Sequence, residues 1–216
     1  MTADISPAMR SLLERECSGQ SVLDFGGGDG ERYGRLVREQ AAKYAVADVS
    51  PAVLAARKEL GDLPIALDEL PNYESAFDVA LMLEVAEHLV DPVAGLKAAV
   101  SAVRPGGRII VSVPNAFSLV NRLRMLAGRL PASGVGAPGL AGKTYLAPHI
   151  RFFDERSLRA LASDAHIGVD ALLADGRDFG PHPRLQRVGI RLEKPSALWT
   201  NTLVLLGRRP TAAQTR

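Results

Sequence analysis

The feature that most constrains this chain is a glycine-rich turn between an apolar run and a helical pattern, at residues 21–31 (Ser-Val-Leu-Asp-Phe-Gly-Gly-Gly-Asp-Gly-Glu). Glycine adopts positive φ without strain and lets a ligand approach the backbone closely, because it has no Cβ. The next apolar segment, 44–49, carries Asp48 near its end. A carboxylate at the end of the second strand of a βαβ unit suits the hydroxyls of a ribose. The pattern predicts a site for a nucleotide-type cofactor.

The spacing of the glycines narrows the class of cofactor. Gly26, Gly28 and Gly30 give G-x-G-x-G. Glu31 stands where the dinucleotide pattern G-x-G-x-x-G has its third glycine. No Gly-Lys-Ser/Thr follows the turn directly, which excludes a P-loop there. Asp29 and Glu31 would also repel a phosphate at this turn. The turn therefore favours a cofactor that has no phosphate and carries a positive charge near the loop.

Short apolar runs alternate with helical patterns along the chain. This predicts a doubly wound α/β fold, with a mainly parallel sheet covered by helices on both faces. Strands are predicted near 21–25, 44–49, 64–67, 77–83, 108–113, 167–173 and 201–207, and helices near 7–17, 31–41, 51–60, 92–103, 117–127 and 154–165. Ser50, Asp91 and Asp154 are predicted to cap three of these helices, and the Arg-Pro-Gly-Gly stretch at 104–107 predicts a turn before the strand at 108–113. A length of 216 residues with 47% hydrophobic residues suits one domain, predicted to span 1–209.

Two segments rich in glycine and proline interrupt the alternation, near 128–148 and 174–197. Long loops inside a compact domain usually serve a function or are disordered. We expect both segments to cover a substrate, the first as a mobile lid; two insertions without a role are the alternative. Residues 210–216 are predicted to form a disordered tail.

Five segments, in order along the chain, resemble a known family. Residues 23–30 (Leu-Asp-Phe-Gly-Gly-Gly-Asp-Gly) resemble the first motif of class I S-adenosylmethionine-dependent methyltransferases, L-D-x-G-C-G-x-G, with Gly27 at the position of the common cysteine. The other four segments are 48–51, 67–69, 77–88 and 104–115. The resemblance implies a seven-stranded sheet of order 3-2-1-4-5-7-6 with strand 7 antiparallel. It also implies S-adenosylmethionine as the methyl donor.

The resemblance further assigns residues to the donor. These are Asp24, Gly26, Gly27, Gly28, Gly30, Asp48, Val49, Asp68, Glu69 and Leu83. The glycine backbone would approach the methionine part, and Asp24 would face its ammonium group. Asp48 would bind the ribose, Asp68 and Glu69 would meet the adenine, and Leu83 would complete the methionine pocket. A strand-end cap for Asp24 and solvated loop positions for Asp68 and Glu69 are the structural alternatives.

The segment Glu84-Val-Ala-Glu87-His88 follows the predicted strand 77–83 at the carboxyl edge of the sheet, where open α/β sheets place their sites. Histidine is a general base near neutral pH, and His88, His149 and Glu84 are the predicted catalytic residues. The E-x-x-E-H spacing resembles ubiquinone-type O-methyltransferases and small-RNA 3′-end methyltransferases, in which such side chains can ligate a divalent ion. We predict no metal. Ligation by these two acids and two histidines is one alternative, and a purely structural role is another.

Charge and composition bear on the acceptor. A net charge of +2 creates no field that demands nucleic acid, and only 5% of residues are aromatic. We expect a small-molecule or glycan acceptor, methylated at oxygen rather than nitrogen. Basic residues near the two insertions would form a rim for an anionic group on that acceptor. They are Arg122, Arg124, Arg129, Arg177, Arg184, Arg187, Arg191 and Lys194. A solvated surface, or contact of 119–130 with a membrane surface, are the alternatives.

The sequence also bears on the cellular location of the protein and on two alternative functions. A single cysteine, an N-terminus unlike a signal peptide and apolar runs shorter than the roughly 18 residues of a membrane helix predict a cytoplasmic protein without stable membrane insertion. A nicotinamide-dependent oxidoreductase is one rival, disfavoured by Glu31 and by the lack of a Tyr-x-x-x-Lys pair. A methyltransferase-fold protein that binds cofactor or a partner without catalysis is the other.

Overall fold

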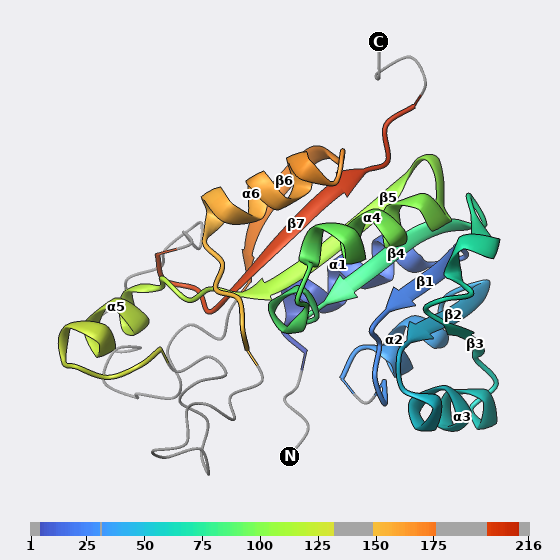
Figure 1. The fold of residues 1–216 in the computed structure, drawn as a ribbon, viewed down its shortest axis with the longest axis horizontal. Coiled ribbons are helices and arrows are strands. Elements are labelled where there is room, and N and C mark those ends of the chain that lie inside the picture. The colour runs from blue at the N-terminus through green and yellow to red at the C-terminus, as the bar shows by residue number, and fades with distance from the viewer. Residues whose placement is uncertain (1–4, 31, 132–148, 176–197, 212–216) are drawn as a thin grey trace.

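The computed structural model describes residues 5–30, 32–131, 149–175 and 198–211. They form one seven-stranded sheet of order β3-β2-β1-β4-β5-β7-β6 (Figure 1). The strands are β1 Ser21–Phe25, β2 Lys43–Asp48, β3 Leu63–Ala66, β4 Phe77–Leu83, β5 Val103–Pro114, β6 Gly168–Asp175 and β7 Thr202–Arg208. β7 runs antiparallel to both β5 and β6, whereas β1 to β5 pair in parallel. The predicted strand order and the antiparallel seventh strand are confirmed.

The helices lie close to their predicted positions. They are α1 Pro7–Cys17, α2 Gly34–Arg38, α3 Pro51–Glu59, α4 Pro92–Ala102, α5 Leu119–Leu126, α6 Glu155–Asp164, and the short 3-10 helices η1 Leu70–Tyr73 and η2 Ala86–His88. α2 is shorter than the predicted helix at 31–41. The turn continues to Tyr33 before α2 begins, because Gly30 and Gly34 both pack against the side chain of Arg57.

Alternate residues of the central strands face opposite layers of helices. In β4, Val79 and Leu81 join the buried cluster that contains residues of α1 and α2. Ala80 and Met82, between and after them, join the cluster that contains residues of α4 and α6. A strand buried on both faces is the signature of a doubly wound parallel sheet, so the fold class is confirmed.

Three helices begin as the sequence predicts. Ser50 caps α3, Asp91 caps α4 and Asp154 caps α6, each accepting a hydrogen bond from a backbone N–H of the first turn. Proline occupies the first turn of α3 and of α4, where its missing N–H costs nothing. At α6, Ser157 bonds back to the Asp154 backbone, which makes a reciprocal capping box.

The start of β5 differs from the prediction. The sequence suggests a turn at 104–107 before a strand at 108–113, but β5 already begins at Val103, which pairs with Phe77. The register shifts before Val79 pairs with Arg108. The glycines of this stretch are therefore absorbed as an irregularity within the strand, and the Gly106 N–H donates to the Arg209 carbonyl at 2.8 Å.

The remaining predictions concern the segments between elements. Most of the insertions predicted near 128–148 and 174–197, and most of the tail at 210–216, lie outside the described residues. α5 projects from the edge of the sheet where β4 and β5 end (Figure 1). Across the described parts of the chain, the helices are all too short or too polar to cross a bilayer.

The capping box of α6 supports a first prediction. Asp154→Ala removes the acceptor of the Ser157 N–H hydrogen bond at 2.7 Å. We expect the free energy of unfolding to fall by about 1 kcal/mol, measured by urea denaturation. Arg159→Ala, at an exposed position of the same helix, should change it by less than about 0.5 kcal/mol. Equal losses in the two variants would contradict the role of the cap.

Candidate active site

The glycine turn lies directly on the ends of the first and fourth strands. Gly26, Gly28 and Gly30 have φ of 71°, 52° and 72°, a region that favours glycine. The Gly26 N–H donates to the Ala47 carbonyl at 2.7 Å, which ties the turn to β2. A Cβ at Gly26 would overlap the side chain of Val85. The turn can follow this path only because these positions carry no side chain.

Asp24 lies beneath the turn at the end of β1. Its side chain is buried, and the Tyr44 hydroxyl donates a hydrogen bond to its carboxylate. A Cβ at Gly27 would overlap that carboxylate. The pKa of Asp24 is raised to about 6, because burial outweighs the lowering by the Tyr44 hydrogen bond and the charge of Arg57. The carboxyl is therefore mostly ionised at neutral pH and can face a cation.

A small cavity of about 110 Å³ opens between the turn and the end of β4. It is lined by Asp24, Gly26, Gly27, Asp29, Gly30, Arg32, Tyr33, Gly34, Leu83 and Glu84. Six of these are predicted site residues. The sequence analysis missed Asp29, Arg32, Tyr33 and Gly34 as lining residues. Their signal was adjacency to the glycine motif, but the residues from 31 onward were interpreted as helix and were not assigned to the site.

The other residues predicted to hold the donor lie outside this cavity. Gly28 belongs to the turn without lining the cavity. At the end of β2, Asp48 Oδ1 accepts a hydrogen bond from the Ser50 N–H at 2.9 Å. Val49 is 77% exposed, and Asp68 and Glu69 are exposed after β3. Since β1, β2 and β3 are neighbours, these groups follow one another along the carboxyl edge of the sheet. A ligand that starts at the turn and extends along this edge would meet them in order.

Glu84, directly after β4, has a positive φ of 58°, which is unusual for a non-glycine residue. Ser112 on β5 holds it twice: the Ser112 hydroxyl accepts from the Glu84 N–H at 3.1 Å and donates to Glu84 Oε1 at 3.0 Å. Arg32 Nη1 lies 3.9 Å from Glu84 Oε2. Burial raises the pKa of Glu84, partly opposed by Arg32 and Ser112. Glu84 thus faces the glycine turn from the opposite wall of the cavity.

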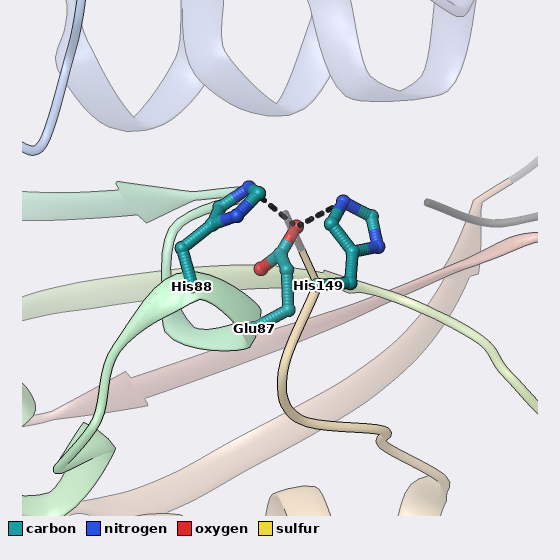
Figure 2. A group of neighbouring side chains, drawn as sticks. All are labelled: Glu87, His88 and His149. Atoms are coloured by element: carbon teal, nitrogen blue, oxygen red, sulfur yellow. Dashed lines mark ion pairs between the residues drawn. The ribbon is translucent and has the colours of Figure 1, made fainter. Parts of the chain in front are cut away.

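Glu87, His88 and His149 form a second group near this edge (Figure 2). Glu87 Oε1 lies 3.8 Å from His88 Nε2 and 3.9 Å from His149 Nε2. The imidazole rings meet edge to face, with centroids 4.7 Å apart. The backbone explains the contact, because the N–H groups of Ile150 and Arg151 both donate to the Glu87 carbonyl. The sequence prediction that His88 and His149 face the same region is consistent with this geometry.

The polar atoms of this group are not all satisfied by hydrogen bonds among the residues that the structure describes. Burial, with the charge of Glu84, raises the pKa of Glu87 to about 8, and burial with His88 lowers the pKa of His149. The short distances therefore do not represent strong ion pairs at neutral pH, since burial favours the neutral form of both groups. Within the described part of the chain, neither Glu87 carboxylate oxygen has a hydrogen-bond partner. An added cation would supply the missing partner.

The donor set of this group fits a divalent metal. One carboxylate oxygen and two imidazole nitrogens lie within 4.8 Å of one another. Carboxylate and imidazole together are ligands that zinc, manganese and iron accept. The metal alternative in the sequence analysis also included Glu84, but its carboxylate is bound by Ser112 and approached by Arg32 instead. The three side chains that could ligate a metal are therefore Glu87, His88 and His149.

A larger open groove of about 840 Å³ lies at the opposite edge of the sheet. It runs between α4, the end of α6 and the ends of β6 and β7, with His166 and Arg208 among its lining residues. It contains none of the predicted site residues. Parallel α/β sheets place their sites at the carboxyl ends of the strands, so the smaller cavity is the better candidate.

The predicted basic rim is described only in part. In and near α5, Arg122 Nε donates to the Phe117 carbonyl at 2.7 Å and Arg124 Nε donates to the Leu130 carbonyl at 3.0 Å. These guanidinium groups are thus partly engaged by the backbone. The basic residues predicted in the second insertion lie outside the described residues.

Comparison with known proteins agrees with this architecture. A family model described as a methyltransferase domain matches residues 1–167. The chain belongs to this methyltransferase family. The family and the fold imply S-adenosylmethionine as the donor, which is consistent with the glycine turn and the acids along the carboxyl edge. The nicotinamide-dependent alternative has no support from this membership.

Individual relatives are more distant. The ubiquinone biosynthesis O-methyltransferase of Idiomarina loihiensis is 30% identical over 122 residues, which cover 51% of this chain and 50% of that protein. The chain thus matches about half the length of this curated relative. A putative methyltransferase structure from Bacillus halodurans has a TM-score of 0.64 at 14% identity, covering 94% of this chain and all of that one.

The fold is not tied to one reaction. The structure of the cyclase SpnF is similar to this chain with a TM-score of 0.61 at 17% identity, covering 95% of this chain and 82% of that one. At such identities the likeness shows the fold alone. Methyl transfer by this chain and the identity of its acceptor therefore depend on its own side chains.

Gly30 supports a prediction about the turn. A Cβ there would overlap the Arg57 guanidinium, and Gly30 has positive φ. We expect Gly30→Ala to lower the free energy of unfolding by about 2–4 kcal/mol, from strain plus overpacking. Gly19→Ala is the control, since Gly19 has φ of 68° but no atom near the added Cβ. It should lose about 1 kcal/mol. Similar losses by denaturant unfolding would show that the contact with Arg57 is unimportant.

Proposed function

We propose that this chain transfers the methyl group of S-adenosylmethionine to an oxygen atom of a small-molecule or glycan acceptor. The single observation that carries the proposal is the position of Glu87, His88 and His149 at the carboxyl edge of the sheet that bears the donor motif. The donor side is supported by family membership and by the buried Asp24 under the glycine turn. The oxygen acceptor is supported by the paired histidines and by the O-methyltransferase name of one relative.

In this proposal the donor extends along the carboxyl edge of the sheet. The cavity of about 110 Å³ suits the amino-acid end, whose ammonium group would pair with Asp24. Leu83 and the glycine backbone would contact the methionine chain. The ribose would lie on Asp48, whose Oδ1 is already oriented by the Ser50 N–H. The adenine would reach the exposed residues Val49, Asp68 and Glu69.

Methyl transfer requires little covalent chemistry from the protein. The acceptor oxygen attacks the methyl carbon, the O–CH3 bond forms, the S–CH3 bond breaks, and the electron pair of that bond stays on sulfur as a neutral thioether. The protein must align the three atoms and remove the hydroxyl proton. His149 is suited to accept it, because burial lowers its pKa and keeps the imidazole neutral. His88, in edge contact with it, can relay the proton to solvent, and Glu84 positions the adjacent wall.

The same three side chains support a second version of this site. Glu87, His88 and His149 would hold a divalent cation, which when bound would lower the pKa of an acceptor hydroxyl. The unpartnered Glu87 oxygens favour this version. In both versions His149 faces the acceptor, whereas in a cofactor-binding protein without catalysis its identity would not matter.

Donor binding is the first test. We expect S-adenosylhomocysteine at about 100 times its Kd to stabilise the protein by about 2.7 kcal/mol, seen as a rise in Tm. Asp48→Asn keeps an oxygen for the Ser50 N–H but removes the charge, and should weaken binding roughly 10- to 100-fold by calorimetry. Glu59→Gln, an exposed acid on α3, is the matched control and should bind like the wild type. An unmoved Tm in the wild type would refute the donor assignment.

Acceptor chemistry is the second test. With labelled donor and a panel of phenols, catechols and sugars, we expect His149→Gln to lower kcat by about 10²- to 10⁴-fold without weakening S-adenosylhomocysteine binding. The control is His166→Asn, at the opposite edge of the sheet, where positive φ tolerates asparagine. Full activity of His149→Gln would exclude both versions of the site.

The two versions are then separated by chelation. If wild-type protein treated with chelator keeps its rate, the histidines act as bases without metal. If the rate falls and Mn²⁺, Mg²⁺ or Zn²⁺ restores it, the metal version holds. Titration of the stripped protein with each ion provides a readout that does not depend on activity, and it should lose its binding heat in His149→Gln.

A further inference from the structure

We propose that Arg57, which the donor motif does not include, is a positioning residue that fixes the glycine turn and the Asp24 carboxylate for the donor. The proposal rests on the proposed function, since it assumes that the turn and Asp24 receive the amino-acid end of S-adenosylmethionine. Arg57 lies in the last turns of α3, and its exposed fraction is 0%. A fully buried arginine is rare unless it is paired, so its partners indicate its role.

The guanidinium of Arg57 contacts three different parts of the donor side. Its Nη1 donates to the Asp29 carbonyl of the glycine turn at 3.3 Å. Its Nη2 donates to the Tyr44 hydroxyl at 2.8 Å, and that hydroxyl donates in turn to Asp24. Its Nε lies 3.2 Å from Asp62 Oδ2. One side chain thus joins the turn, the strand-end acid and the segment after α3.

The turn is packed against this guanidinium without space for a side chain. A Cβ at Gly30 would overlap Arg57, and a Cβ at Gly34 would crowd both Arg57 and the Tyr44 hydroxyl. Gly30 of the donor motif is therefore also required by the buried arginine, and so is Gly34 beyond the motif. This close packing indicates that Arg57 fixes the position of the turn relative to the sheet.

A second arginine holds Arg57 in place through Asp62. Asp62, which is buried, accepts two hydrogen bonds from Arg38, at 2.5 Å from Nε and 2.8 Å from Nη2. The result is a chain of interactions from Arg38 through Asp62, Arg57 and Tyr44 to Asp24. Burying such charges costs more than filling the space with apolar side chains of similar volume. A function beyond packing accounts for the chain, and its end at the predicted ammonium site points to the donor.

The electrostatics at Asp24 agree with the geometry. Five groups influence or face its carboxyl: Tyr44, Arg57, Asp62, Asp48 and Cys17. The pKa of Asp24 is raised to about 6, mainly by burial and with smaller contributions from the charges of Asp62 and Asp48. Among these groups, only Tyr44 and Arg57 lower the pKa of Asp24. Without Arg57 the carboxyl would be protonated at a higher pH, and a neutral carboxyl cannot pair with the ammonium group of the donor.

The test measures the Kd of S-adenosylhomocysteine by calorimetry between pH 6 and 8.5. Arg57→Met removes the charge and the hydrogen bonds. We expect its affinity to be below that of the wild type at every pH, because the turn loses its hydrogen bond, and the loss to be largest at low pH, because Asp24 ionises at a higher pH than in the wild type. For each unit by which the pKa of Asp24 exceeds the assay pH, the affinity should fall about tenfold. The ratio of variant to wild-type Kd cancels the titration of the ligand's own amino group.

Two further variants separate charge from shape. Arg57→Lys keeps the charge but cannot reach all three partners, so its pH profile should stay near that of the wild type while its affinity falls at every pH. Tyr44→Phe removes the hydrogen bond to Asp24 and leaves Arg57 in place, and its profile should shift to higher pH as in Arg57→Met. If circular dichroism shows that Arg57→Met does not fold, Tyr44→Phe still tests the shift in the pH profile. This variant should fold, because the substitution removes only one hydroxyl group.

Leu161→Ala provides the matched control for lost stability. Leu161 is buried in α6, on the opposite face of the sheet from α1 and α2. It should lower the Tm and leave the Kd and its pH profile unchanged. Wild-type affinity and an unshifted profile in both folded Arg57→Met and Tyr44→Phe would overturn the positioning role alone. Failure of the wild type to bind S-adenosylhomocysteine at any pH would instead overturn the proposed function on which that role rests.

Discussion

The structure depends on a glycine-rich turn that closes over a buried carboxylate at the end of β1. Gly27 covers Asp24 and Gly30 covers Arg57, and neither position has space for a Cβ. This contact fixes the direction in which the chain leaves the first strand and delays the start of α2 to Gly34. It also leaves a cavity in which the Asp24 carboxyl is shielded from water. Buried, partly compensated charge of this kind is typical of sites that await a charged ligand.

The two halves of the site are stabilised in different ways. On the donor side, the acids Asp24 and Asp62 are balanced by Tyr44, Arg57 and Arg38, so that this half is preorganised before any ligand arrives. On the acceptor side, neither carboxylate oxygen of Glu87 has a hydrogen-bond partner among the described residues. An organised donor half and an uncompensated acceptor half fit a reaction in which the donor is common to a family and the acceptor is specific to each member.

Much of the fold could be predicted because local signals agreed with one another. Apolar runs gave the strands, and the capping residues Ser50, Asp91 and Asp154 marked helix starts that the structure confirms. The errors lie where packing outweighs local preference. The segment after Gly30 has a helical pattern, yet contact with Arg57 holds it in a turn, and the Pro-Gly-Gly stretch before Arg108 is absorbed into β5 because pairing with β4 begins earlier.

By itself, the sequence determined the glycine turn after a buried strand and the acid at the end of the next strand, since both are set by backbone geometry at short range. Only the tertiary structure decided that His149 meets Glu87 and His88, that Glu84 turns to Ser112, and that Arg57 reaches under the turn from α3. These contacts join residues distant in the chain. Their geometry depends on strand order and helix packing, and no local pattern of residue types contains that information.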